Sequence, residues 1–258
     1  WLGNFHDIFS NETVNRAAYD FWLKKTRARI KDPILAEKLA PLEPPHPYGV
    51  KRPSLEQWYF DIFNQDNATL VSLLDESINE IVPEGIVTTK GTHNFDIIAF
   101  ATGFDAVTGG LTSINIVGTD GTTLKEKWAQ GVRSHLGLAT TNFPNMLVSY
   151  GPQAPTGFCN GPSSAEYQGE CVIETLLHMR DNMYSKFDVA SEAENHWRSH
   201  VMELADATLF PKADSWYMGA NIPGKPKEML MYPGGLPAYL NEFRECASNG
   251  FRGFEFSN

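Results

Sequence analysis

The sequence predicts an α/β fold, because two kinds of apolar pattern occur along it. Apolar residues recur at helical spacing, most clearly over residues 163–183 and 189–208. Short runs rich in β-branched and aromatic residues, separated by Gly or Asn turns, predict strands. One of them, residues 95–100, has the continuous apolar character of a strand buried on both faces of a sheet.

Three small residues, Ala101, Thr102 and Gly103, follow this run. Gly103 has no Cβ, so the backbone there can turn sharply or approach another group closely. Ligands of open α/β sheets bind beyond the carboxyl ends of the strands, which makes this point a candidate binding site. The alternative interpretation is that Gly103 simply ends the strand.

The composition limits the class of protein. With 258 residues, of which 42% are hydrophobic and 20% charged, the chain can form one large or two modest globular domains. The net charge of −10 argues against a nucleic-acid partner. No apolar run approaches the roughly 20 residues of a membrane helix, so we expect no membrane contact. Three widely spaced cysteines suit a reducing compartment, and we expect a cytoplasmic protein. Because the first residue is Trp1, we also expect an upstream segment that this sequence lacks.

The elements follow in order along the chain. A helix is predicted from residues 11–13 to about 29, with Lys and Arg gathered near its end, and a second over 32–39. Four prolines within residues 41–47 predict an extended linker. Predicted strands cover 69–74, 77–82, 85–89, 95–100, 113–117 and 146–150, and predicted helices cover 163–183, 189–208 and 236–248. The chain has no Gly-x-Gly-x-x-Gly fingerprint, so it supplies no complete dinucleotide-binding βαβ unit.

Lys51 and Arg52, just before Pro53, form the first candidate site. Pro53 favours extended backbone before it, which points the two cationic side chains in opposite directions. One interpretation is a solvated basic pair. The other is anion recognition, in which the permanently charged Arg52 stabilises an anionic intermediate.

The second candidate is the loop of small residues over 151–162, which leads directly into a predicted helix. The unpaired N–H groups at a helix start favour an anion or an electron-rich ring edge. The alternative is a purely structural turn. Cys159 lies in this loop without a recognisable base, so we do not expect a nucleophile there.

The third candidate is the loop over 214–226, which carries Trp216, Tyr217 and Met218 among Gly and Pro residues. Large apolar side chains on a Gly-hinged loop suggest a lid that closes over a ligand. The alternative is an Ω-loop that packs its own aromatic residues against the body of the protein. His196 and His200 are spaced four residues apart on a helix but lack a third ligand, so no metal site is predicted.

Taken together, these motifs resemble the C-terminal half of a flavin-dependent Baeyer–Villiger monooxygenase of the cyclohexanone/phenylacetone monooxygenase type. The segments that carry the resemblance are Lys51 to Pro53, residues 96–106, 124–128, 150–152 and 215–226, and Gly234-Gly235. It implies the C-terminal parts of a flavoprotein with two dinucleotide-binding domains and a helical insertion. The insertion and linker would span residues 1–47, the NADPH domain would end with 48–100, and the FAD domain with 101–258.

The resemblance also implies the activity: FAD and NADPH use O2 to convert a ketone to an ester or lactone through a peroxyflavin. Arg52 would be the catalytic arginine, and Lys51 would hold the NADPH 2′-phosphate. Cofactors would further contact Thr102, Gly103, Asn160, Gly161 and Trp216, and the ketone would contact Thr156, Gly157 and Phe158. The N-terminal half of the enzyme would be the chain's partner. Two alternatives stay open: a related flavin N- or S-oxygenase, and a truncated, non-catalytic binding module.

Overall fold

The computed structural model describes residues 7–258, which form two compact units. Unit 1 comprises Thr13–Tyr48 and Arg52–Gly103 together with the described residues up to Ile8. Unit 2 comprises Phe9–Glu12, Gly49–Lys51 and Phe104–Asn258. The chain therefore passes between the units beside Lys51 and again at Gly103, two of the places that the sequence singles out.

Helices α1 (Glu12–Arg27) and α2 (Pro33–Leu39) lie where the sequence predicts them. The first turn of α1 carries Glu12 and its last turn carries Lys and Arg, which complements the helix dipole. Asp32 caps α2 by accepting a hydrogen bond from the backbone of Ile34. The buried Asn15 amide donates to the carbonyl oxygens of Ile8 and Tyr48, at 2.8 and 2.9 Å, and so ties α1 to the end of the proline-rich segment. A one-turn helix, α3 (Tyr59–Ile62), follows.

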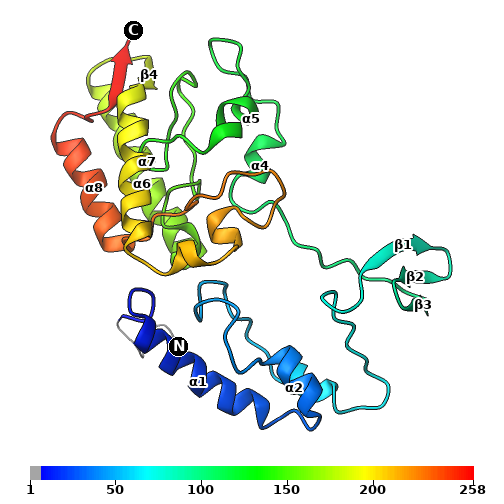
Figure 1. Cartoon of the computed structure of the whole chain (residues 1–258). Helices are drawn as coiled ribbons and strands as arrows, with labels where there is room; N and C mark the ends of the chain where they lie inside the picture. Colours follow the sequence, from blue (N-terminus) through cyan, green and yellow to red (C-terminus); the bar gives the residue numbers. More distant parts are fainter. Residues whose placement is uncertain (1–6) are drawn as a thin grey trace. The chain divides into compact units, whose positions relative to one another are not determined.

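The remainder of unit 1 is a small antiparallel sheet of strands β1 (Ile78–Val82), β2 (Gly85–Thr88) and β3 (Gly91–Asn94) (Figure 1). Gly85 begins β2 with a φ of +155°, and a Cβ there would lie 1.9 Å from the carbonyl oxygen of His93. Only glycine permits this close pairing of the two strands. The sequence predicts β1 and β2 but misses β3.

The predicted strand over 95–100 is wrong for this structure, and so is the one over 69–74. A strand buried on both faces needs neighbours that accept its backbone hydrogen bonds and cover its side chains. Within residues 7–258, no strand pairs with 95–100, and Ile97 and Phe100 are 85% and 69% exposed. The segment is therefore irregular. Residues 113–117 and 146–150 are also irregular, apart from a single bridge between Val117 and Thr123.

Unit 2 is built on three helices, α6 (Gly161–Asp181), α7 (Ser191–Asp206) and α8 (Leu236–Ser248) (Figure 1). They enclose one apolar core with Trp197, Tyr239 and Phe243 among its buried members. Helix α7 begins two residues later than predicted, because Lys186–Val189 forms strand β4 instead. Strand β4 pairs antiparallel with β5 (Phe254–Ser257), and the sequence analysis misses both.

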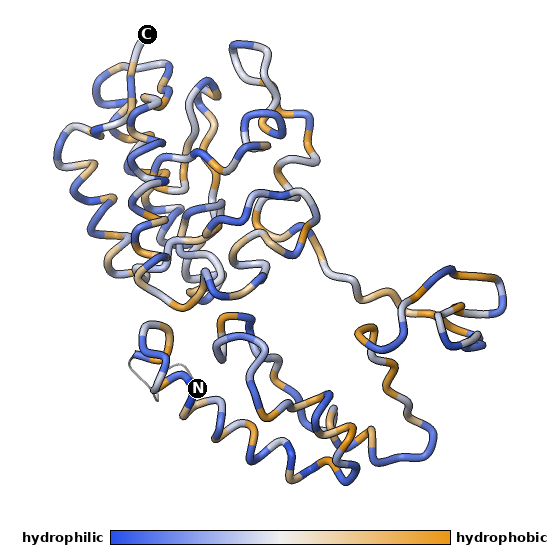
Figure 2. The backbone as a smooth tube through the Cα atoms, viewed as in Figure 1, coloured by the Kyte–Doolittle hydropathy of each residue, from blue (hydrophilic) through white to orange (hydrophobic). Residues whose placement is uncertain are grey.

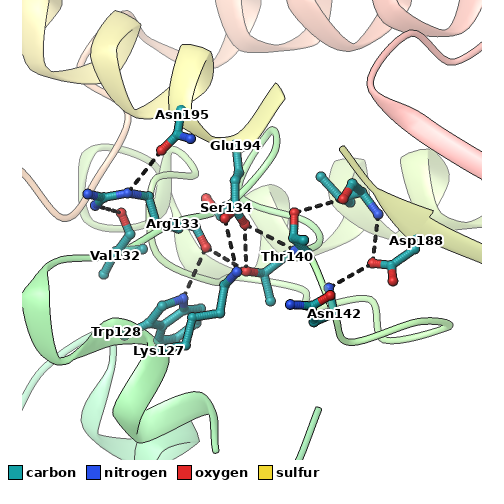
Figure 3. Close-up of polar contacts among 12 residues, drawn as sticks. Lys127, Trp128, Val132, Arg133, Ser134, Thr140, Asn142, Asp188, Glu194 and Asn195 are labelled. Atoms are coloured by element: carbon teal, nitrogen blue, oxygen red, sulfur yellow. Dashed lines mark hydrogen bonds and ion pairs between the residues drawn. The ribbon is translucent and has the colours of Figure 1, made fainter. Parts of the chain in front are cut away.

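Two short helices, α4 (Gly109–Thr112) and α5 (Leu124–Lys127), precede α6. A partly buried ion pair joins the end of α5 to α7. Lys127 at the end of α5 donates to Glu194 of α7 at 2.9 Å. The other oxygen of Glu194 accepts from the Thr140 hydroxyl and the Thr141 backbone, both at 3.0 Å. Figure 3 shows these contacts, with Glu194 reaching from its helix toward the loop. One carboxylate thus sets the path of the chain ahead of residues 150–161.

Figure 2 shows hydrophilic and hydrophobic residues mixed along each long helix. Among residues 7–258, no helix combines the length and apolar character that crossing a bilayer requires.

Candidate functional site

The structure brings two of the predicted loops of unit 2 into contact. Thr156–Phe158 form a short 3₁₀ turn, η2, just before α6, and Trp216–Met218 form another, η4, at the start of the 214–226 loop. The Phe158 ring stacks on the Tyr217 ring with centroids 5.1 Å apart and planes 10° apart. Tyr217 in turn stacks on Trp216 at 4.2 Å. The predicted substrate residue Phe158 and the predicted cofactor residue Trp216 therefore belong to one aromatic stack.

Gly157 lies at the closest point of this contact. Its backbone N–H points at the sulfur of Met231, 3.2 Å away. A Cβ at Gly157 would lie 2.5 Å from that sulfur and 3.0 Å from Cη2 of Trp216. A side chain here would force Met231 to move and the indole to shift slightly, so glycine lets both side chains approach the turn closely.

Thr156 is buried, at 3% exposed, and its carbonyl oxygen accepts a hydrogen bond from the Tyr150 hydroxyl at 3.1 Å. The Tyr150 backbone N–H donates to Gln168 of α6 at 2.6 Å. Gln168 then donates to the hydroxyl of Tyr239 in α8, and that hydroxyl donates to the carbonyl oxygen of Leu136. Burial raises the pKa of Tyr239, so its phenol stays protonated and can donate. This chain of hydrogen bonds fixes the loop to the core.

Asn160 and Gly161 form the start of α6. The Asn160 side chain accepts from the backbone of Ser163 at 3.3 Å and caps the helix, while Pro162 occupies its first turn. A Cβ at Gly161 would lie 3.3 Å from the Tyr150 hydroxyl. The helix start is thus bounded by small residues and one phenol.

The 214–226 loop is closed at its base by main-chain pairing. Glu228 donates its backbone N–H to the carbonyl oxygen of Met218 at 3.0 Å, and Leu230 donates to that of Tyr217 at 2.9 Å. The Glu228 carboxylate, which is buried, accepts from the Val132 backbone at 2.5 Å and from Arg198 at 2.7 Å. The base of the loop is therefore fixed on the protein body, and the tip between residues 219 and 226 extends from it.

The remaining predicted site residues lie elsewhere. Lys51 is exposed in unit 2, whereas Arg52, Thr102 and Gly103 are exposed in unit 1. Their roles stay predictions.

The pKa of Asp214 is lowered, chiefly by its hydrogen bond from Lys227 and the charge of that lysine, with a smaller contribution from Lys51.

Sequence reasoning misses two residues of the site. Met231 contacts Gly157 from beyond the 214–226 loop (named the lid loop for its predicted role), and its place in an apolar run gives no signal of that contact. Tyr150, which the sequence marks only as the end of an apolar run, adopts a φ of +60°. This conformation is unusual for a tyrosine and turns the chain into the loop. Within residues 7–258, no three His, Cys, Asp or Glu side chains are arranged to hold a metal ion.

No protein-family model matches the chain. Individual proteins of known function and solved structures do match it in sequence and in fold. It is 53% identical to cyclopentanone 1,2-monooxygenase of Comamonas sp. (strain NCIMB 9872), over 100% of this chain and 47% of that protein. The closed crystal structure of a cyclohexanone monooxygenase matches with a TM-score of 0.92 and 39% identity, over 99% of this chain and 47% of that one. The crystal structure of OTEMO in complex with FAD and NADP matches with a TM-score of 0.92 and 36% identity, over 98% of this chain and 46% of that one. The chain spans about half the length of the relatives it matches.

Proposed function

Because the chain is homologous along its length to the C-terminal half of flavin-dependent Baeyer–Villiger monooxygenases, we propose that it forms that half of an FAD- and NADPH-dependent enzyme. The enzyme would use O2 to convert a ketone to an ester or lactone. Bound FAD supplies the oxygen activation, and NADPH supplies the electrons. Within the structure, the observation that supports the proposal is the packing of the Thr156–Phe158 turn against Trp216 and Tyr217.

The residues of unit 2 have distinct tasks in this proposal. The start of α6, capped by Asn160, would lie against the flavin edge, and Gly161 would let the ring approach without a side chain between them. The turn at Thr156, Gly157 and Phe158 bounds the space for the ketone. Trp216 covers the nicotinamide cofactor from the lid loop. The small residues at the start of α6 support a site for FAD. The position of Trp216 supports a site for NADP.

In unit 1, Arg52 would provide a fixed positive charge beside the reacting oxygen, and Thr102 and Gly103 would contact a cofactor. In unit 2, Lys51 would bind the 2′-phosphate of NADPH as a point charge. Residues 1–47 would be the helical insertion and linker, 48–100 the end of the NADPH domain, and 101–258 the end of the FAD domain. We propose a cytoplasmic location, consistent with the three free cysteines.

The partner of the chain in this proposal is the N-terminal half of the enzyme. Within unit 1, the apolar segment 95–100 is exposed and unpaired by any described strand, although its sequence suits a central strand. Within unit 2, one face of α6 exposes Ile173, Leu176 and Leu177. Apolar surfaces of this kind indicate contact with further protein.

The proposal is tested on protein isolated from the cells that make it. Its absorption spectrum reports bound flavin, mass spectrometry reports an N-terminal segment, and assays with ketones, amines and sulfides in parallel report the reaction class. We expect flavin and ester formation from a ketone. A colourless chain without the N-terminal segment would instead support a non-catalytic binding module.

The proposed roles of the two cations are tested separately in that enzyme. Arg52→Ala is expected to leave NADPH-driven flavin reduction and to abolish ester formation. Lys51→Ala is expected to raise the KM for NADPH and to leave kcat nearly unchanged, because it removes binding to a non-reacting phosphate. Ester formation by Arg52→Ala at the parent rate would refute the assignment of Arg52.

A further inference from the structure

Lys225, at the tip of the lid loop, makes the most extensive contacts of that tip. Its ammonium group donates to the Asp105 carboxylate at 2.5 Å and to the Thr108 hydroxyl at 2.7 Å, with the carbonyl oxygen of Ala106 3.5 Å away. The Lys225 side chain is 14% exposed and the Asp105 side chain 38%, so the ion pair is partly shielded from water. Charge-assisted hydrogen bonds of this kind are stronger than neutral ones.

A second contact acts on the same two segments. The side-chain amide of Asn221 donates to the carbonyl oxygen of Phe104 at 3.0 Å. The lid tip is therefore held at two points on residues 104–108, which directly follow Gly103. The base of the loop is fixed independently by the pairing of Glu228 and Leu230 with the turn at Trp216.

The side chain of Lys225 also reaches the end of the Trp216 turn. Gly219, which ends that turn, has a φ of +65°, and a Cβ there would lie 3.4 Å from Cε of Lys225 and 3.2 Å from the carbonyl oxygen of Pro226. The lysine stem thus lies against the residue that closes the turn. Gly219 and Ala220 in turn donate to the carbonyl oxygens of Trp216 and Ser215, at 3.2 and 3.1 Å.

We propose that Lys225 is a positioning residue for Trp216: by bonding to Asp105 and Thr108, it holds the lid loop in the one conformation that keeps the indole against Gly157. The neighbouring Lys227 differs, because it pairs with the exposed Asp214 and is itself 43% exposed. Exposed ion pairs contribute little to conformation. Two lysines of one loop therefore have different tasks, and Lys227 is a matched control.

The position of Trp216 is measured directly by ¹⁹F NMR of protein labelled with 5-fluorotryptophan, its resonance being assigned with Trp216→Phe. Lys225→Met is expected to shift or broaden that resonance while the other tryptophan resonances stay in place. Asp105→Asn is expected to do the same more weakly, Lys225→Arg to restore much of the parent spectrum, and Lys227→Met to leave it unchanged. A Trp216 resonance identical to the parent in Lys225→Met would overturn the proposal.

Limited proteolysis with chymotrypsin provides a second readout, since its sites include Trp216 and Tyr217. Loss of the Lys225 contacts is expected to raise the cleavage rate at this turn about tenfold, the factor expected for hydrogen bonds to a charged group. Circular dichroism confirms that each variant is folded. Equal cleavage of Lys225→Met and Lys227→Met would contradict the role of Lys225.

The consequence for catalysis rests on the proposed function. If Trp216 covers NADPH, Lys225→Met raises the KM for NADPH more than it lowers kcat, and Lys225→Arg restores it. The NMR and proteolysis results do not depend on activity. An altered Trp216 resonance without any monooxygenase activity would refute the proposed function and leave the role of Lys225 intact.

Discussion

The α-carbon of Gly157 faces the indole of Trp216 so closely that a Cβ at this position would lie 3.0 Å from Cη2 of the ring. The two residues are far apart in the sequence, and their contact joins the turn before α6 to the lid loop. A single methyl group at Gly157 would separate them.

Gly157→Ala is therefore expected to displace Trp216 and Met231 and to cost roughly 1–3 kcal/mol of unfolding free energy, the usual cost of overpacking. Urea unfolding measures this cost. The control is Gly169→Ala on α6, where nothing lies within 4 Å of the new Cβ. Because alanine favours helices, the control is expected to stabilise the protein by about 0.5–1 kcal/mol. Equal effects of the two substitutions would show that the close contact is unimportant.

Lys127→Met is expected to destabilise unit 2 by about 3 kcal/mol, because it leaves the buried Glu194 carboxylate without its cation. The measurement is again urea unfolding. Lys125→Met, two residues away and exposed, is the matched control and should change stability by less than about 0.5 kcal/mol. A small effect at Lys127 would mean that Thr140 and Thr141 alone satisfy Glu194.

The buried His135 is expected to make the free energy of unfolding depend on pH. Burial lowers its pKa from 6.5 to about 4. Between these values the unfolded chain binds a proton that the folded protein does not, so stability is complete above pH 6.5 and falls as the pH falls. The slope is about 1.4 kcal/mol per pH unit, which gives a loss of about 2 kcal/mol by pH 5.

Urea unfolding at pH 7.5 and pH 5 measures this loss. His135→Gln is expected to flatten the dependence in this range, whatever its stability at pH 7.5. His46→Gln, in unit 1, is the control and should retain the parent slope. An unchanged slope in His135→Gln would assign the dependence to other groups.

Asn160→Ala removes the cap of α6 and is expected to cost about 1 kcal/mol, whereas Asn160→Asp keeps an acceptor and should cost little. Urea unfolding compares the two variants. If alanine and aspartate gave the same stability, the contact between Asn160 and Ser163 would contribute nothing.

The long helices were predictable from the sequence, and the strands only in part: β1 and β2 were predicted, whereas β3, β4 and β5 were missed. The periodic apolar residues of α1, α6, α7 and α8 identify them, because a helix satisfies its own backbone and needs only one apolar face. A strand depends on a partner. Residues 95–100 have the composition of a central strand but no partner in the described part of the chain, and β5 is too short to be recognised.

The candidate site was predictable where loops carry unusual composition. The loop over 151–162 and the lid loop were both recognised from small and aromatic residues, and the structure joins them through Phe158 and Tyr217. The contact of Met231 was not predictable, because a methionine that contacts a glycine N–H has the same sequence pattern as a methionine that fills a core. Contacts of this kind depend on distances that spacing along the chain does not encode.

The hydrogen-bond chain from Tyr150 through Gln168 to Tyr239 has a consequence for evolution and engineering. It links the Thr156 turn to α8. A substitution of a residue that packs against Tyr239 therefore shifts the turn without contacting any ligand. If Thr156, Gly157 and Phe158 contact the ketone as proposed, mutagenesis confined to these three residues samples only part of the sequence variation able to alter substrate preference. Substitutions in the buried face of α8 would alter the position of the Thr156 turn in the same way, although they lie outside the turn.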